Sequence, residues 1–205
     1  MNLAQFGLLI ATRNTGKLRE IEALLSDTDL RLYSLRDFSA LPEVEETGAT
    51  FADNAGLKAS AYARQGLWTL ADDSGLEVDA LGGAPGVRSA RYAGEGASDA
   101  ERNALLLREL ARTNDAERRA RFVCAIAIAN PTGEVLHISL GVCEGHIAQE
   151  PRGQNGFGYD PLFIPDGYTK TFSELPDEIK QQLSHRARAL SKARVFLLKL
   201  LEGSA

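Results

Sequence analysis

A short apolar run that breaks into small, polar and basic residues just before a helical pattern is the feature that most constrains this fold. Residues 8–11 predict a buried strand, and apolar residues recur at helical spacing over residues 18–25. The turn between them, residues 12–17, therefore lies at a helix N-terminus. Unpaired backbone N–H groups and the positive end of the helix dipole meet there, and Lys17 adds a full charge. The segment predicts a phosphate site.

Other interpretations of this turn must be weighed. It lacks the glycine spacing of G-x-x-x-x-G-K-[ST] and of G-x-G-x-x-G, so it is neither a Walker loop nor a dinucleotide fingerprint. An ordinary strand-to-helix turn, with Asn14 or Thr15 as the N-cap, explains the same residues without a ligand. The turn alone does not decide between these alternatives.

A pair of adjacent carboxylates favours the phosphate interpretation. Asp72 and Asp73 follow a second predicted strand, residues 67–71, and we expect them to end it. Successive side chains of an extended segment point to opposite sides, so one carboxylate can face a metal or water while the other braces a loop. Mg²⁺ prefers one or two carboxylates together with substrate phosphate oxygens. The alternative is an Asx-type turn closed by Ser74 and Gly75.

Composition limits the classes of function. The chain has 205 residues, of which 44% are hydrophobic, which suits one domain with room for two lobes. Lys and Arg number 23 against 28 Asp and Glu, a formal charge of −5, so we expect no nucleic-acid partner. Cys124 and Cys143 lie in apolar runs and predict reduced core residues, typical of the cytoplasm. We see no signal peptide and no membrane-spanning stretch, and expect no membrane partner.

The order of predicted elements indicates a layered α/β fold. Capping-box patterns predict helices that start near residues 50 and 98, the first running to about residue 65. Residues 122–129 and 135–142 predict an antiparallel hairpin with a turn at residues 130–133. The first of these strands is apolar on both faces, which predicts a central place in the sheet.

Two further segments suit nucleoside recognition. Three glycines lie within residues 153–158, where Phe157 and Tyr159 offer aromatic faces on which a base could stack. Residues 184–186, Ser-His-Arg, lie between a predicted helix over residues 177–183 and a C-terminal helix, and their donors suit carbonyl or ring-nitrogen edges. Taken singly, a glycine-rich surface turn and a solvated basic turn are the simpler interpretations.

Together these segments closely resemble the Ham1/RdgB family of non-canonical purine nucleotide pyrophosphatases, in order and spacing, over nearly the whole chain. The resemblance rests on TRNTGK at 12–17, EETG at 45–48, residues 51–58, ADDSGL at 71–76, GGAPG at 82–86, FGYDP at 157–161 and SHR at 184–186. It implies an α/β fold with an elongated mixed β-sheet flanked by helices, and an active site in the cleft between two lobes. It also implies Mg²⁺-dependent hydrolysis of dITP, ITP and XTP to the monophosphate and pyrophosphate by a cytoplasmic homodimer.

The same resemblance assigns roles to individual residues. Asp73 is expected to be the catalytic base and a metal ligand, and Glu45 and Glu46 share the metal site, with the actual ligand undecided. The triphosphate is expected on the turn at residues 12–17, chiefly on Asn14 and Lys17. The expected substrate-binding residues are Thr12, Arg13, Asn14, Thr15, Gly16, Lys17, Lys58, Ser74, Phe157, Gly158, Tyr159, Asp160, Lys180, His185 and Arg186, with Phe157 or Tyr159 as the stacking face.

The sequence departs from the family pattern at two positions, and other classes stay open. Arg13 stands where the family often has a small residue, and Ala187 stands where glycine is usual. A haloacid-dehalogenase-type phosphatase needs two aspartates separated by one residue, a spacing that Asp72 and Asp73 lack. A Maf-like pyrophosphatase for other modified nucleotides and a non-catalytic nucleotide-binding module remain as alternatives.

Overall fold

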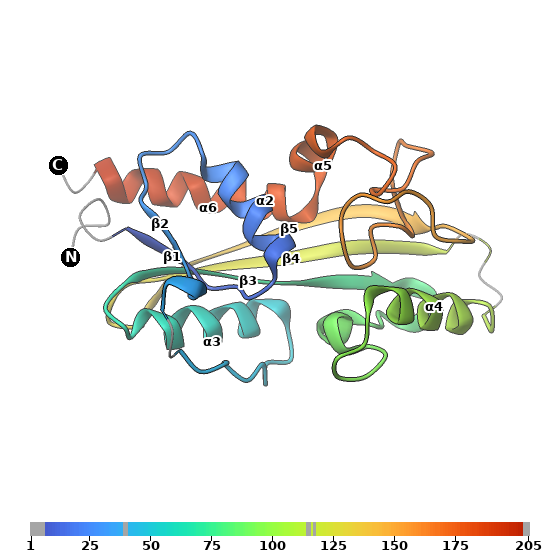
Figure 1. Cartoon of the computed structure of the whole chain (residues 1–205), viewed down its shortest axis with the longest axis horizontal. Helices are drawn as coiled ribbons and strands as arrows, with labels where there is room; N and C mark the ends of the chain where they lie inside the picture. Colours follow the sequence, from blue (N-terminus) through green and yellow to red (C-terminus); the bar gives the residue numbers. More distant parts are fainter. Residues whose placement is uncertain (1–6, 39–40, 114–115, 117, 203–205) are drawn as a thin grey trace. The chain divides into compact units, whose positions relative to one another are not determined.

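The computed structural model describes residues 7–38, 41–113, 116 and 118–202. Among these residues it contains a six-stranded mixed sheet of order β2-β1-β3-β4-β5-β6, flanked by helices, which confirms the expected α/β class (Figure 1). β1 pairs in parallel with β2 and β3, and β5 pairs antiparallel with β6. The strands are β1 (Leu8–Ile10), β2 (Leu32–Ser34), β3 (Trp68–Val78), β4 (Arg119–Ala129), β5 (Val135–Ile147) and β6 (Phe163–Pro165). The helices are α2 (Thr15–Leu25), α3 (Phe51–Ala63), α4 (Asp99–Leu110), α5 (Asp177–Leu183) and α6 (His185–Glu202), with short 3-10 turns η1 (Leu35–Asp37), η2 (Asp79–Leu81) and η3 (Gly86–Arg91).

The helices begin where their capping residues predict. Asn14 is the N-cap of α2, and its side chain accepts a hydrogen bond from the Lys17 backbone. Thr50 and Ser98 open α3 and α4 with complete capping boxes, in which the side chain three residues later bonds back to the cap. None of the helices among the described residues has the length and apolar character needed to span a membrane.

The sheet corrects one expectation from the sequence. Asp72 and Asp73 do not end a strand, and no Asx turn forms there, because β3 continues through both residues to Val78. Asp72 and Asp73 are 2% and 5% exposed, so both carboxylates lie in the interior of a long strand. Buried carboxylates are tolerated inside a strand when the adjacent strands satisfy the backbone hydrogen bonds and cationic side chains pair with the carboxylates. The structure provides such partners for both carboxylates.

The hairpin prediction is confirmed, and its strands are longer than expected. β4 and β5 are neighbours in the sheet and are joined by the turn at residues 130–134. The Asn130 N–H donates to the Glu134 carbonyl at 2.9 Å, which closes this turn. β4 lies between β3 and β5, the internal position that its apolar faces predict.

The chain forms two compact units, each built from separate stretches of sequence. Unit 1 comprises the chain up to Asp73, residues 124–141 and the chain from Arg186 onward. Unit 2 comprises residues 74–123 and 142–185. Strands β3, β4 and β5 contribute residues to both units.

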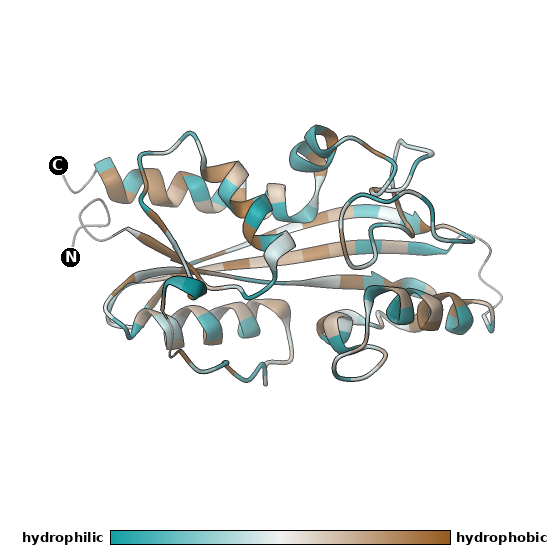
Figure 2. Ribbon diagram, viewed as in Figure 1, coloured by the Kyte–Doolittle hydropathy of each residue, from teal (hydrophilic) through white to brown (hydrophobic). Residues whose placement is uncertain are grey.

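Unit 1 has a core between the sheet and two helices. α2 and α6 cover one face of its strands, and α3 covers the other face (Figure 1). Hydrophobic residues follow β1 and alternate with hydrophilic ones around α6 (Figure 2), as expected for a helix with one buried side. The most deeply buried members of this core include Leu8, Ile10, Ile21, Leu25, Leu70, Ile126, Ile128, Leu190 and Leu197.

Unit 2 has a separate core that is rich in aromatic rings. Phe122, Phe163 and Phe172 pack together, with the first two ring centroids 4.5 Å apart. Leu106 and Leu110 of α4 belong to the same core, as their helical spacing predicts. Because both units are densely packed, the polar side chains that they hold have defined positions.

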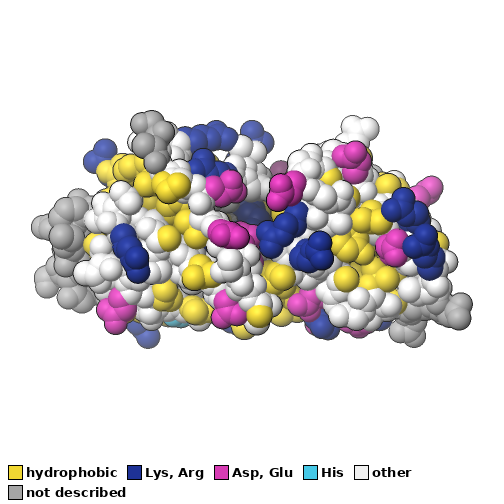
Figure 3. Space-filling model, turned by 90° about the horizontal axis from the view of Figure 1, so that it is seen from below, with side chains coloured by type: hydrophobic (Ala, Val, Ile, Leu, Met, Phe, Trp, Pro, Cys, Tyr) yellow, Lys and Arg dark blue, Asp and Glu magenta, His cyan; other side chains and the backbone are white. Residues whose placement is uncertain are grey.

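The surface carries mixed charge. Figure 3 shows Lys and Arg side chains interspersed with Asp and Glu on the face that it presents, and its described side chains form no extended basic patch. This distribution agrees with the formal charge of −5.

Candidate active site

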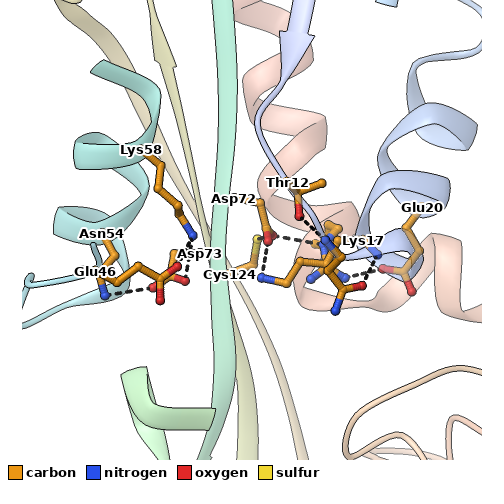
Figure 4. A network of polar contacts seen from close by, with 11 residues as sticks. Thr12, Lys17, Glu20, Glu46, Asn54, Lys58, Asp72, Asp73 and Cys124 are labelled. Atoms are coloured by element: carbon orange, nitrogen blue, oxygen red, sulfur yellow. Dashed lines mark hydrogen bonds and ion pairs between the residues drawn. The ribbon is translucent and has the colours of Figure 1, made fainter. Parts of the chain in front are cut away.

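The first cluster of the site, in unit 1, surrounds Asp73. The Lys58 ammonium lies 2.6 Å from Glu46 Oε1 and 3.2 Å from Asp73 Oδ1, so it bridges the two carboxylates. Asn54 Nδ2 donates to Asp73 Oδ2 at 3.2 Å. These side chains lie together on the α3 side of β3 (Figure 4). The structure thus brings the predicted catalytic aspartate together with one of the two predicted glutamates.

Local sequence explains why these residues meet. Asn54 and Lys58 are four residues apart on α3 and therefore share one helix face. The Gly48 N–H donates to Asn54 Oδ1 at 2.7 Å, which ties the loop that carries Glu46 to the helix. A Cβ at position 48 would lie 2.7 Å from the same oxygen and 2.6 Å from the Asp53 Cβ. Only glycine allows this approach.

The donor set around Lys58 suits a divalent cation that also binds substrate. No group of three or more His, Cys, Asp or Glu side chains among the described residues could hold a metal ion alone. Two carboxylates that converge on one cation, however, match the one or two that Mg²⁺ takes when phosphate oxygens complete its shell. Glu46 is half-buried and turned toward this point, whereas Glu45 is exposed. The geometry therefore favours Glu46 over Glu45 as the second ligand.

The pKa values of Asp73 and Lys58 are both raised in this cluster. Burial raises the pKa of Asp73, and the nearby Lys58 ammonium offsets only part of that rise. For Lys58 itself burial would lower the pKa, but the Asp73 and Glu46 carboxylates outweigh it and the net shift is upward. Asp73 is thus a carboxylate with raised basicity beside a permanent cation, which suits a group that accepts a proton.

The second cluster, also in unit 1, surrounds Asp72 on the opposite side of β3 (Figure 4). Lys17 Nζ lies 2.5 Å from Asp72 Oδ1, and Arg186 Nε donates to Asp72 Oδ2 at 3.0 Å. Cys124 Sγ also donates to Oδ2, at 3.0 Å, and Arg186 Nη1 pairs with Glu20. The expectation that the two aspartates do different jobs on opposite sides of the strand agrees with this arrangement.

This second cluster is the more deeply buried of the two. The side chains of Asp72 and Arg186 are 0% and 1% exposed. Burial opposes ionisation of Asp72, but the Arg186 and Lys17 charges together hold the pKa of its carboxyl well below the usual range. Burial also raises the pKa of the Cys124 thiol, which therefore keeps its proton as a donor. Asp72 therefore stays ionised in the protein interior and holds the Lys17 and Arg186 side chains in position.

The turn at residues 12–17 leads into the N-terminus of α2 with Asn14 as the N-cap, which is the ordinary strand-to-helix turn expected as the alternative to a phosphate site. Asn14 Oδ1 accepts from the Lys17 N–H at 3.0 Å, and Thr12 Oγ1 accepts from the Asn14 N–H at 3.2 Å. Thr15 and Gly16 form the first turn of α2, and Arg13 Nη2 donates to the carbonyl of residue 41 at 2.6 Å. The turn therefore points the N-terminus of α2 outward, with Lys17 anchored by Asp72 beside it.

Unit 2 holds the predicted nucleoside-binding residues other than Arg186. Lys180 Nζ lies 2.6 Å from Asp160 Oδ2 and 4.6 Å from the centroid of the Phe157 ring. The Phe157 N–H donates to the same Asp160 oxygen at 2.9 Å, so the Asp160 carboxylate binds both the Phe157 backbone and the Lys180 side chain. Tyr159 differs from the expectation, because its ring is 4% exposed in the core and its hydroxyl donates to the Ser89 carbonyl at 2.9 Å. Of the two candidate stacking faces, Phe157 is the half-buried one and is favoured.

The predicted Ser-His-Arg segment divides between the units. His185, in unit 2, is 4% exposed and stacks on Phe122 with ring centroids 4.7 Å apart. Arg186, in unit 1, directs Nε to Asp72 and Nη1 to Glu20, so its observed role is to position Asp72. Arg186 was expected to bind substrate, but in this structure its side chain is 1% exposed and its donors are directed to these carboxylates. Ala187 is buried on the same helix, and Ser74 lies on β3 in unit 2.

Sequence reasoning missed two residues that complete these clusters. Asn54 binds Asp73, and its position one helical turn before Lys58 was a usable signal. Glu20 neutralises Arg186, and it lies three residues after Lys17 on the same face of α2. Its partner is 166 residues away in sequence, so no local pattern could have revealed that contact.

Comparison with known proteins agrees with this fold. The Ham1 family model matches residues 8–196. A dITP/XTP pyrophosphatase of Exiguobacterium sibiricum is 51% identical over 195 residues, 95% of this chain and 98% of that protein. One of Geobacter sulfurreducens is 54% identical over 185 residues, 90% of this chain and 92% of that protein. The solved HAM1 protein of Coxiella burnetii superposes with a TM-score of 0.85 at 45% identity, covering 94% of this chain and 98% of its own. On the strength of this match along nearly its whole length, the chain belongs to the Ham1 family.

Proposed function

We propose that this chain is a nucleoside triphosphate pyrophosphatase that hydrolyses dITP, ITP and XTP to the monophosphate and pyrophosphate. The observation that carries the proposal is the bridge of Lys58 between Glu46 and Asp73, beside a cationic helix N-terminus. Relatives that share about half of their residues with this chain are named dITP/XTP pyrophosphatases. Such an enzyme keeps non-canonical purines out of DNA and RNA.

The chain's own residues supply three functions in this proposal. The N-terminus of α2 and the Lys17 ammonium bind phosphate oxygens, and Lys58 adds charge at Asp73. Asp73 accepts the proton of the water that attacks the α-phosphorus, because burial raises its pKa. Positioning and electrostatic stabilisation provide most of the rate acceleration, as in phosphoryl transfer generally.

Mg²⁺ is the proposed cofactor, held by Asp73 and Glu46 together with substrate oxygens. When bound, it would neutralise phosphate charge and make the phosphorus more electrophilic. Asn54 orients the Asp73 carboxylate for both tasks through its hydrogen bond to Oδ2.

Selectivity is proposed to come from the segment around Phe157 together with Lys180 and His185 of unit 2. Hypoxanthine and xanthine carry an acceptor at position 6, where adenine carries an amino donor. A protein donor aimed at that position would be left unsatisfied by adenine, at about 1–3 kcal/mol for each such group. Two mismatched contacts give a discrimination of about 10²–10⁴. Guanine shares the 6-oxo group, so its exclusion depends on the 2-amino group.

We also propose that the enzyme is a homodimer and acts in the cytoplasm. Leu136, Ile138 and Leu140 on β5 are 41%, 47% and 49% exposed and alternate along one face of the strand. The described pairing of β6 with β5 starts at Gly145, so this stretch of β5 offers its apolar face to a second copy. The buried thiols Cys124 and Cys143 suit a reducing compartment. Light scattering of wild type against Ile138→Lys tests the dimer, which the lysine should dissociate.

The decisive experiment measures turnover of dITP, XTP, dATP and dGTP with and without Mg²⁺ and separates pyrophosphate from orthophosphate. Pyrophosphate released from dITP and XTP alone, only with Mg²⁺, supports the proposal. Orthophosphate would identify a phosphatase instead. Preference for another modified nucleotide would favour a Maf-like enzyme, and nucleotide binding without turnover would favour a binding module.

A further inference from the structure

Helix α4 holds the aromatic loop of unit 2 at both backbone polar groups of one residue, Gly158. Asp99 Oδ2 accepts from the Gly158 N–H at 2.7 Å, and Asn103 Nδ2 donates to the Gly158 carbonyl at 3.0 Å. Asp99 and Asn103 are four residues apart, so they lie on one face of α4. Asp99 and Asn103 thus form hydrogen bonds to both backbone polar groups of Gly158. We call this pair of side chains the α4 clamp.

The clamped residue lies next to the proposed stacking face. Gly158 follows Phe157 directly, and the Phe157 N–H is held in turn by Asp160 Oδ2 at 2.9 Å. The Phe157 ring is approached by Lys180 Nζ at 4.6 Å from its centroid. The backbone on both sides of the Phe157 Cα is therefore tied down, by Asp160 before it and by the α4 clamp after it. This fixes the direction in which the ring projects.

The clamp is also anchored rigidly. Asn103 is 4% exposed, and α4 packs into the core of unit 2 through Leu106 and Leu110. Its first turn is stabilised by the capping box of Ser98 and Glu101, with Glu101 Oε2 accepting from the Ser98 N–H at 2.7 Å. A contact from such a helix limits the loop far more than a contact from another loop would.

We infer that Asp99 and Asn103 are positioning residues for base recognition, which orient Phe157 through Gly158. The inference rests on the proposed function and deepens it, because it assigns substrate specificity to a helix outside the predicted site. The clamp acts on the base end of the nucleotide alone. Its loss should therefore weaken nucleotide binding and leave binding of the phosphate end unchanged.

The test compares Asp99→Ala and Asn103→Ala with a conservative variant and a matched control. Asp99→Asn keeps a side-chain oxygen that can accept from Gly158, so it should restore most of what Asp99→Ala loses. Arg108→Gln changes an exposed side chain of the same helix that pairs with Glu109, and serves as the control. The measurements are KM and kcat for dITP and the inhibition constant of inorganic pyrophosphate.

We expect both alanine variants to raise the KM for dITP at least threefold, with kcat within twofold and pyrophosphate inhibition unchanged. In a Phe157→Ala background the same substitutions should add nothing, because the residue through which they act is gone. An unchanged KM in the alanine variants, when Phe157→Ala raises it, overturns the inference. A parallel loss of pyrophosphate inhibition also overturns it, since that would indicate general damage. If wild type releases no pyrophosphate from dITP, the proposed function itself fails.

Discussion

The two adjacent aspartates should respond in opposite ways when each carboxylate is replaced by an amide. Asp72→Asn removes an anion whose side chain is 0% exposed and leaves Arg186, 1% exposed, with Glu20 as its remaining carboxylate. Loss of one partner from a buried ion pair costs about 3–5 kcal/mol, and Glu20 places this case near the lower end. For a chain of this size, 3 kcal/mol corresponds to a fall in melting temperature of about 6–12 °C.

Asp73→Asn should leave the fold intact and stop the reaction. Burial raises the pKa of Asp73, so its ionised form is disfavoured in the folded protein, and a neutral amide of the same shape relieves that cost. Lys58 keeps Glu46 as a partner. We therefore expect a melting temperature within about 4 °C of wild type, because the net change in stability is under about 1 kcal/mol. The loss of turnover should be at least about a hundredfold, typical for removal of a general base.

Thermal melts followed by circular dichroism, together with pyrophosphate release from dITP, measure both effects on the same preparations. Wild type and the two variants are compared at pH 7 without added nucleotide. Equal destabilisation of the two variants would refute the division of labour, since it would mean that neither carboxylate is specifically structural. A melting temperature of Asp72→Asn within 2 °C of wild type would refute the buried-anion argument.

Three further predictions follow from the same geometry. Lys58→Met leaves Asp73 and Glu46 facing each other without the ammonium, and steady-state kinetics should show turnover reduced at least about tenfold; unchanged kinetics would remove Lys58 from the site. The pKa of Asp72 is lower in the folded protein than in the unfolded chain. The ionised Asp72 side chain therefore stabilises the folded state at any pH above its unfolded-state pKa, and this stabilisation is lost as pH falls toward its folded-state pKa. In urea titrations, the stability gap between wild type and Asp72→Asn should thus persist from pH 7 to about 4 and narrow below that; a gap that narrows above pH 5 contradicts this. Gly156→Ala places a Cβ 2.2 Å from Asp160 Oδ2 and should raise the KM for dITP, whereas Gly82→Ala, with similar backbone strain and open space, should not.

Much of the fold followed from local patterns in the sequence. Capping boxes at Thr50 and Ser98 predicted the starts of two helices, and the N-cap candidates Asn14 and Thr15 that of a third, because a cap needs only residues within one turn. The hairpin of β4 and β5 followed from alternating apolar runs around a turn. The prediction that the strand ends at Asp72 was wrong. It rested only on the polarity of Asp72 and Asp73, whereas β3 continues through both residues to Val78.

The candidate site was predicted less completely. Asp73, Lys58 and one of the glutamates do meet, but the sequence could not choose between Glu45 and Glu46, since adjacent loop residues differ only in the direction that the tertiary fold gives them. Tyr159 looked as suitable for stacking as Phe157 until the packing of unit 2 placed it in the core. These choices depend on which side of a segment is buried, and a single sequence contains that information only weakly.

The sequence by itself determined that Asp72 and Asp73 would face opposite sides, because extended backbone alternates its side chains whatever surrounds it. It also determined that residues 12–17 would begin a helix with a basic residue in its first turn. Only the tertiary structure decided which cation meets which carboxylate. Lys17 and Arg186, 169 residues apart in sequence, both reach Asp72 because α2 and α6 pack on the same face of the sheet. Two side chains can form an ion pair at any separation in the sequence, so the packing of the elements decides which side chains meet.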